Sequence, residues 1–306
     1  MHISRVVFKI SDIVNHPLRN YIRYDGIRSV KNIPYGTGKF RRMDFYYSTK
    51  AAEAAPDGKL PVLLNVHGGG FVCGGKKYRS GIAKLFASKG YFVVNVDYTL
   101  APKGAFPTGG NDVIMAWNAL ELFDERYPLD LERVIITGDS AGGYWAAMAV
   151  AAAFSDDYRL ELGLDETPSR KPIALLTFCA PFNLIKCTEH PTPMGISEDI
   201  GDCLFGNAEN AAKLPPKAID ITLNVNSDWC PVGMMAAAND MFAGSQHKDM
   251  VKKLDEFSVP HSEYVAAEKG DGHCTHLYPF KKGSSKTIEA AEQFLNGVLL
   301  NKTRSV

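Results

Sequence analysis

The sequence lacks the features that are typical of nucleic-acid-binding proteins and of membrane proteins. Lysine plus arginine (34) equal aspartate plus glutamate (34), and no basic run is dense enough for a nucleic-acid surface. No apolar run approaches the length of a membrane-spanning helix, and polar residues interrupt the N-terminus before a signal-peptide core could form. We therefore expect neither a nucleic-acid partner nor a membrane span.

Paired cysteines and cofactor motifs are missing as well. The six cysteines are scattered without any Cys-x-x-Cys spacing, which argues against a disulfide framework or a zinc site. Reduced thiols are usual in the cytosol. The sequence also has no phosphate-binding loop and no dinucleotide-binding glycine motif. These absences predict a cytoplasmic protein that needs no cofactor and no metal.

Alternating strand and helix patterns predict an α/β fold. Short apolar or β-branched runs indicate eight strands, at residues 30–35, 43–47, 60–66, 91–96, 134–137, 173–179, 232–238 and 262–267. Helical patterns separate most of them, chiefly at residues 78–88, 112–127, 146–153, 246–257 and 287–300. This alternation predicts a mostly parallel sheet with helices on both faces. We expect one domain over residues 1–306, since α/β folds often reach this length.

Three segments do not fit this alternation. Residues 1–30 have a helical spacing that Pro17 interrupts, which predicts short helices or an irregular arm. Residues 51–59 are small and polar, as in a turn region. Residues 180–231 are irregular, with several prolines and helical pieces at 197–205 and 207–213. So long a connection usually carries function, for example as a lid.

Residues 134–153 combine a strand, a Gly-x-Ser-x-Gly turn and a helix. The turn is Gly138-Asp-Ser-Ala-Gly142, and the alanine-rich residues 146–153 favour a helix soon after it. This context is that of a nucleophile elbow, in which a serine hydroxyl is exposed on a strained turn. Taken alone, the motif is equally compatible with a serine that only caps the helix.

Four polar motifs each follow a predicted strand end, at His67, Ser140, Asp240 and His273. The carboxyl ends of parallel strands meet at one edge of the sheet, where ligands bind. A serine nucleophile needs an imidazole base, and that imidazole needs a carboxylate to fix its tautomer. The glycines that follow His67 suit the donors of an oxyanion hole. The four motifs therefore predict a serine-nucleophile site at this edge.

Three motifs together resemble the hormone-sensitive-lipase-like esterases of the α/β-hydrolase superfamily. They are His67-Gly-Gly-Gly70, Asp97-Tyr-Thr-Leu-Ala-Pro102 with Phe106-Pro107, and Gly138-Asp-Ser-Ala-Gly-Gly143. The resemblance implies the α/β-hydrolase fold, an eight-stranded sheet with a small cap. It also implies that the amides of Gly69, Gly70 and Ala141 form the oxyanion hole and that His67 braces this loop. Homo-oligomers are common in the family, but no surface patch in the sequence establishes one.

The triad order of the family is serine, acid, histidine, which directs the search downstream of Ser140. Asp240 follows a predicted strand directly, as the acid of the family does. Asp228 is the alternative, but no buried strand closely precedes it. Asp139 belongs to the family signature and is expected to be structural. We therefore predict Asp240 as the acid.

Two histidines of one loop compete as the base. Gly272-His273 resembles the family signature, but Cys274 and Thr275 stand where the family commonly has an aromatic residue. This departure keeps His276 as the alternative to His273.

The resemblance predicts a serine carboxylesterase that hydrolyses a small-molecule ester through an acyl-enzyme. Residues 1–30 and 182–215 are expected to form the cap, and their polar and aromatic mixture favours short, acetyl-like acyl groups. An amidase or peptidase with the same triad is one alternative, because the fold does not determine the leaving group. A non-catalytic ligand-binding protein on the same scaffold is the other.

Overall fold

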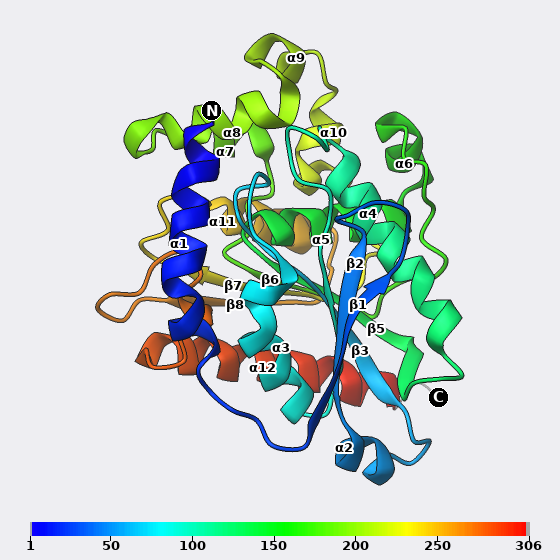
Figure 1. Ribbon diagram of the computed structural model, residues 1–306. Helices are drawn as coiled ribbons and strands as arrows, with labels where there is room; N and C mark the ends of the chain where they lie inside the picture. Colours follow the sequence, from blue (N-terminus) through cyan, green and yellow to red (C-terminus); the bar gives the residue numbers. More distant parts are fainter. Residues whose placement is uncertain (1, 304–306) are drawn as a thin grey trace.

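The predicted α/β architecture is present in the computed structural model, which describes residues 2–303 (Figure 1). One eight-stranded sheet has the order β1-β2-β4-β3-β5-β6-β7-β8. Its strands are β1 (Ile27–Pro34), β2 (Arg42–Ser48), β3 (Leu60–Val66), β4 (Phe92–Val96), β5 (Leu129–Asp139), β6 (Ala174–Phe178), β7 (Val232–Ala237) and β8 (His261–Ala266). β2 runs antiparallel to both of its neighbours, and the other neighbouring strands are parallel.

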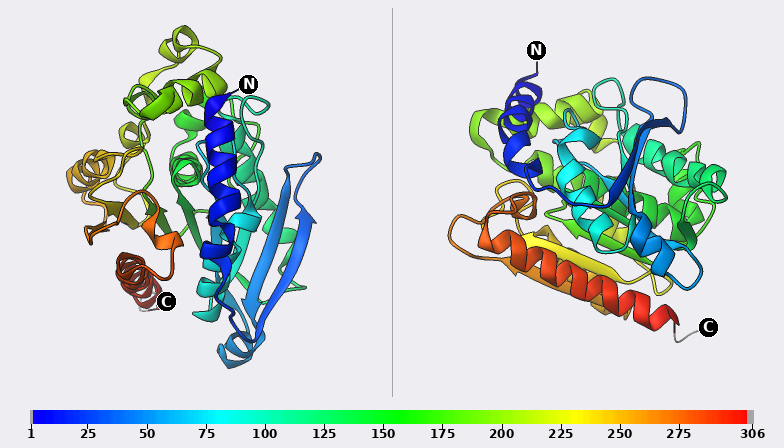
Figure 2. Two further views of the ribbon diagram at one scale, coloured as in Figure 1. Left: turned by 60° about the vertical axis from the view of Figure 1, so that its left-hand side comes forward. Right: turned by 60° about the horizontal axis from the view of Figure 1, so that its bottom comes forward.

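Helices cover both faces of this sheet, as the alternation predicts. The α-helices are α1 (Ile3–Asn20), α2 (Thr49–Ala54), α3 (Ser80–Ser88), α4 (Thr108–Asn118), α5 (Ala141–Phe154), α6 (Asp156–Leu162), α7 (Leu184–Thr188), α8 (Ile196–Phe205), α9 (Ala208–Ala212), α10 (Pro216–Ile219), α11 (Gln246–Glu256) and α12 (Lys282–Thr303). Short 3₁₀ helices are η1 (Lys76–Arg79), η2 (Ala119–Phe123), η3 (Pro193–Gly195), η4 (Ile221–Asn224) and η5 (Thr275–Leu277). Figure 2 shows α12 lying along one face of the sheet.

The two faces of the sheet form two separate hydrophobic cores. On β3, Val62 and Leu64 pack with α4 and α5, whereas Leu63 packs with α3 and α12. Successive strand residues point to opposite faces, so a strand buried on both sides must be apolar throughout. This requirement explains the continuous apolar runs of the central strands. The edge strands β1 and β8 are partly exposed and lack such runs.

The predicted strands are all present, but several helices differ from the prediction. α1 is one continuous helix through Pro17, which was expected to break it. Pro17 lies near the end of α1, and tertiary contacts hold the helix on either side of it. Ser4 N–H donates to Asp199 (2.9 Å), and Asn20 Oδ1 accepts from Gly81 N–H (2.6 Å).

Four α-helices, α2, α6, α7 and α10, occur where the sequence analysis placed none, and a serine caps the start of two of them. Residues 49–54 are helical rather than a turn, because the hydroxyl oxygen of Ser48 accepts from Ala51 N–H and caps α2. α6 is capped in the same way by Ser155 and ends at Gly163, whose φ is +59°. Such caps satisfy backbone groups locally, so these short helices need no strong apolar periodicity.

The N-terminal helix α1 packs against α8 of the long segment that follows β6. Figure 1 shows α1 beside α7 and α8. Ser4 and His2 at the start of α1 hydrogen-bond the Asp199 carboxylate of α8. No helix among the described residues is long and apolar enough to cross a membrane.

Candidate active site

Ser140 lies on a sharp turn between β5 and α5. Its φ and ψ are +52° and −125°, a backbone conformation that a residue with a side chain adopts only under strain. The turn is held because Ser140 N–H donates to the carbonyl of Phe178 on β6 (2.8 Å). Ser140 directly follows the last residue of β5, and α5 begins at the next residue, Ala141. This is the geometry of a nucleophile elbow.

The flanking glycines are required by close backbone contacts. A Cβ atom at Gly138 would lie 2.4 Å from the carbonyl oxygen of Gly142. A Cβ atom at Gly142 would lie 2.2 Å from the carbonyl oxygen of Val66 on the neighbouring strand. Both separations are far below van der Waals contact, so side chains at either position would push the helix off the sheet.

Three of the predicted site residues form one chain of hydrogen bonds. Ser140 Oγ lies 2.8 Å from His273 Nε2, and His273 Nδ1 lies 2.8 Å from Asp240 Oδ1. Asp240 Oδ1 also accepts the backbone N–H groups of Phe242 and Ala243, each at 2.9 Å. These donors orient the carboxylate. Burial raises the pKa of Asp240, but His273 and the two amides outweigh it and the pKa is lowered.

His273 has a perturbed pKa that sets the pH range of the site. Burial alone would lower the pKa of the imidazole, but the Asp240 carboxylate 2.8 Å from Nδ1 favours its protonated form, and the pKa is raised well above 6.5. A base must be neutral to accept a proton. The His273 imidazole therefore becomes able to accept a proton only as the pH rises through this elevated pKa.

The raised pKa of His273 predicts the pH profile of the activity. We expect kcat/KM for an ester to fall on the acid side with a midpoint above pH 6.5, because the free enzyme loses its neutral imidazole there. Initial rates measured from about pH 5 to pH 9 locate this midpoint. A midpoint below 6.5 would contradict a raised pKa at His273.

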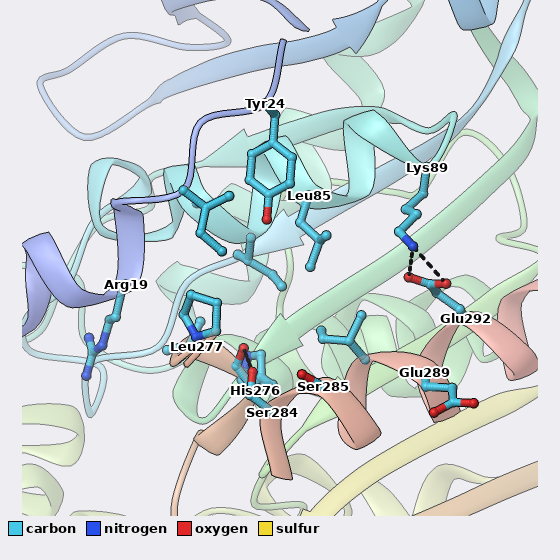
Figure 3. A pocket seen from close by; sticks show the side chains of 15 residues that line it. Arg19, Tyr24, Leu85, Lys89, His276, Leu277, Ser284, Ser285, Glu289 and Glu292 are labelled. Atoms are coloured by element: carbon cyan, nitrogen blue, oxygen red, sulfur yellow. Dashed lines mark hydrogen bonds and ion pairs between the residues drawn. The ribbon is translucent and has the colours of Figure 1, made fainter. Parts of the chain in front are cut away.

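The alternative residues lie elsewhere. His276 is buried and stacks on Phe178 (ring centroids 4.1 Å apart), and burial lowers its pKa to about 3. Figure 3 shows His276 with Leu277 and Ser284 in the lining of a pocket between α3 and α12, and Ser140 is not part of this lining. Asp228 is exposed in a loop. The structure therefore brings Asp240 and His273 to Ser140, and not Asp228 or His276.

The glycine loop that follows β3 lies beside the serine. Gly69 and Gly70 have φ values of +133° and +59°, which few residues other than glycine adopt. Gly70, Ala141, Ser140 and His273 line the same small cavity. Two of the three residues expected to provide oxyanion donors, Gly70 and Ala141, thus line the cavity at the serine, and Gly69 directly precedes Gly70 in the loop.

His67 lies beneath this loop and contacts no triad residue through its ring nitrogens. Its Nδ1 is 2.8 Å from Gly68 O, and its ring stacks on Tyr98 with centroids 4.4 Å apart. The Tyr98 hydroxyl in turn donates to His67 O (3.0 Å). Burial lowers the pKa of His67, which favours a neutral ring. These contacts match the expected bracing position.

A buried ion pair next to the serine was not predicted. The Arg79 guanidinium binds both oxygens of Asp139 at 2.7 Å, and both side chains are almost fully buried. Burial raises the pKa of Asp139, but Arg79 outweighs burial and holds that pKa well below its usual range. Asp12 of α1 lies 3.8 Å from Arg79 and 3.1 Å from Arg19. This cluster connects α1 to the elbow, and no motif in the sequence singles out Arg79.

Replacing Arg79 by leucine is expected to lower the free energy of unfolding by about 3–5 kcal/mol, because Asp139 would remain buried without its partner. Urea unfolding followed by circular dichroism measures this loss. The exposed Lys77 provides a matched control, and Lys77→Leu should change stability by less than about 0.5 kcal/mol. Equal stability of the two variants would contradict the structural role of the ion pair.

The small cavity at Ser140 is closed by residues of α1 and α8. Its lining comprises Phe8, Gly70, Phe71, Ser140, Ala141, Pro181, Cys187, Ser197, Ile200, Phe242, Ala243 and His273. A Cβ atom at Gly70 would lie 2.5 Å from the Phe8 ring and 3.1 Å from Ile200 Cδ1. The Phe8 ring also contacts Phe242 (5.8 Å between centroids), which contacts His273 (5.0 Å). The reacting groups are thus covered by apolar side chains.

The chain is similar in sequence to one family model and to several known proteins. The BD-FAE family model matches residues 43–254. Tuliposide A-converting enzyme b1 of Tulipa gesneriana is 38% identical over 100 residues, which cover 29% of this chain and 26% of that protein. Ethyl acetate hydrolase of Pseudomonas putida is 37% identical over 87 residues, or 28% and 27% of the two chains. The matched region thus spans about a quarter of the length of these relatives.

Solved structures resemble the whole chain. Esterase B from Lactobacillus Rhamnosis superposes with a TM-score of 0.83 at 18% identity and covers 98% of this chain and 96% of its own. A bacterial heroin esterase gives 0.74 at 19% identity, with 96% and 91% covered. At such identities the likeness establishes the fold, which is that of the α/β-hydrolases.

Proposed function

The chain belongs to the BD-FAE family, and on that premise we propose that it is a serine carboxylesterase of the hormone-sensitive-lipase-like type. The observation that carries this proposal is the hydrogen-bonded chain from Ser140 through His273 to Asp240. All three side chains lie at strand ends on one edge of the sheet, in the order that this fold uses.

Each triad residue has a defined part in the reaction. Ser140 Oγ attacks the ester carbonyl while His273 Nε2 accepts the serine proton, which it then donates to the leaving alcohol. Water attacks the resulting acyl-enzyme with His273 again as base, and this step releases the acid. Asp240 accepts the His273 Nδ1–H throughout and stabilises the imidazolium.

The negative oxygen that forms on the carbonyl needs donors that are already in place. We assign this part to the amides of Gly69, Gly70 and Ala141, of which Gly70 and Ala141 line the cavity at the serine. A well-placed donor of this kind contributes about 3 kcal/mol to transition-state stabilisation. Because backbone amides cannot reorient like side chains, the positive φ values of the two glycines orient these donors before substrate binds.

The cap and the acyl pocket support a short-chain substrate. In the proposed enzyme, residues 1–30 and 182–215 cover the serine, and Phe8 and Ile200 narrow the space above Gly70. A long acyl chain would have to displace these side chains. Among the proteins compared, one relative is named for ethyl acetate, and esterase B has been crystallised with a tributyrin phosphonate inhibitor. We therefore propose acetyl-like to butyryl-like esters as substrates.

A chain-length series of p-nitrophenyl esters tests this proposal. We expect kcat/KM to be highest for acetate or butyrate and to fall for longer chains, because the Phe8–Ile200 closure excludes them. The variant Ser140→Ala gives the background rate of hydrolysis without the proposed nucleophile. Faster hydrolysis of long chains would contradict the short-chain assignment. Faster hydrolysis of matching p-nitroanilides would indicate an amidase, and a wild type no faster than Ser140→Ala would indicate a ligand-binding protein.

A further inference from the structure

The two residues that follow the proposed base depart from the family pattern, and the first of them is Cys274. Cys274 has a φ of +57°, and Cys179, at the end of β6, has a φ of +50°. Few residues other than glycine adopt such values, and both cysteines are buried. Cys274 N–H donates to Cys179 Sγ at 3.2 Å. These two unusual turns place two thiols side by side.

The same two thiols lie next to the proposed base. The sulfur atoms of Cys179 and Cys274 and a ring nitrogen of His273 all lie within 4.8 Å of one another. Cys179 is held on the sheet side because its N–H donates to Met235 O on β7 (2.7 Å). Cys274 Sγ also lies 3.8 Å from Asp139 Oδ2. The cluster therefore consists of two sulfur ligands and one nitrogen ligand on backbone that neighbouring strands hold in place.

We propose that Cys179, Cys274 and His273 form an inhibitory site for a thiophilic divalent cation such as Zn²⁺. Two thiolates and an imidazole are ligands that zinc prefers, and tetrahedral zinc separates such ligand atoms by about 3.6–3.8 Å. The observed separations therefore have to contract by about 1 Å at most. A water molecule completes the four-coordinate shell.

Binding has a defined proton balance. The two neutral thiols lose their protons to solvent, two sulfur–metal bonds and one nitrogen–metal bond form, and no group is oxidised or reduced. Metal affinity should increase with pH, because thiols bind a metal as thiolates.

Metal binding would inactivate the triad. His273 Nε2 bonds Ser140 and His273 Nδ1 bonds Asp240, so both ring nitrogens are already engaged. A cation on Nε2 occupies the lone pair that would accept the serine proton. A cation on Nδ1 replaces the hydrogen bond to Asp240 that orients the ring. The inhibition rests on the proposed esterase function, whereas the binding of the metal does not.

The cluster was not visible in the sequence. Cys179 and Cys274 are separated by 95 positions, far from any spacing typical of a zinc motif. Only the adjacency of the β6 end and the loop that follows β8 brings them together.

A zinc titration with a matched set of variants tests the proposal. Ester turnover is measured against free Zn²⁺ in the presence of a non-thiol reductant, for wild type, Cys179→Ser, Cys274→Ser and Cys203→Ser. Cys203 is the control because it belongs to a different cluster, with His2 and Asp199. We expect wild type and Cys203→Ser to be inhibited alike, and a chelator to restore activity.

Loss of either sulfur ligand should weaken inhibition. Removal of a group that only supports a metal ligand already costs 10–100-fold in affinity, so Cys179→Ser and Cys274→Ser should each need at least about tenfold more Zn²⁺ for half-inhibition. Each variant is compared with its own metal-free rate. Equal inhibition of all four proteins, or relief in Cys203→Ser alone, would overturn the proposal. Activity restored by stronger reduction but not by the chelator would indicate a disulfide instead.

A spectroscopic measurement separates this proposal from the proposed function. Cobalt bound to thiolates gives a near-ultraviolet charge-transfer band that does not depend on catalysis. We expect the band in wild type and Cys203→Ser and a weakened band in Cys179→Ser and Cys274→Ser. If the band appears but the protein has no esterase activity, the metal site is supported and the proposed function is rejected. Activity without a band would reject the metal site alone.

Discussion

Replacing His273 by alanine should lower kcat for a short-chain ester by about six orders of magnitude, as should Ser140→Ala. Without the imidazole, the serine hydroxyl has no acceptor for its proton and the leaving alcohol has no donor. Long-incubation assays of ester hydrolysis measure the residual rate, and active-site titration excludes contamination by wild-type enzyme. The double variant should be no slower than either single variant, because the two residues act as one unit.

His276→Ala is the matched control for this result. His276 lies three positions along the same loop, but its ring stacks on Phe178 and does not reach Ser140. We expect it to lower stability, because it leaves a cavity in the core, while kcat of the folded variant stays within about tenfold of wild type. The reverse pattern, with His273→Ala active and His276→Ala inactive, would show that the base has been assigned wrongly.

Replacing Asp240 by asparagine should lower kcat by about 10⁴-fold while leaving the fold intact. An amide has nearly the same shape as the carboxylate, but it carries no charge to stabilise the imidazolium. Its amide group can also present a donor to His273 Nδ1, which stabilises the wrong tautomer. Rates are measured at saturating ester, together with the melting temperature.

Asp228→Asn provides the comparison for Asp240→Asn. Asp228 is the other acid that the sequence allows, and its carboxylate is exposed in a loop. The same chemical change there should leave kcat within about twofold, as is usual for surface positions away from a site. A large loss at Asp228 together with a small one at Asp240 would mean that a different carboxylate supports the base.

The structure also connects α1 to the turn that carries Ser140. Asp12 of α1 contacts Arg79, which holds Asp139 beside Ser140. Near the start of the same helix, Ser4 N–H donates to the Asp199 carboxylate of α8. Polar contacts therefore hold α1 near its start and at its middle. Movement of α1 during substrate entry would have to break at least one of these contacts.

The sequence was sufficient to predict the sheet and the turn that carries Ser140, because both depend on local patterns. A strand buried on two faces must be apolar along its whole length, and the central strands show this as short continuous runs. The elbow likewise leaves a local signal, since Gly138 and Gly142 have to lack side chains where strand and helix nearly touch. The proximity of Asp240 to His273 could be predicted because Asp240 closely follows the end of β7.

Only the tertiary structure could distinguish His273 from His276. The two lie in one loop, and a positive φ at the intervening Cys274 turns one ring toward Ser140 and the other into the core beside Phe178. The same turn creates the contact with Cys179, which no spacing in the sequence predicts. The Arg79–Asp139 pair is also formed by residues far apart in the chain. Such contacts are decided by how strand ends and loops pack together, and short sequence motifs carry no record of that packing.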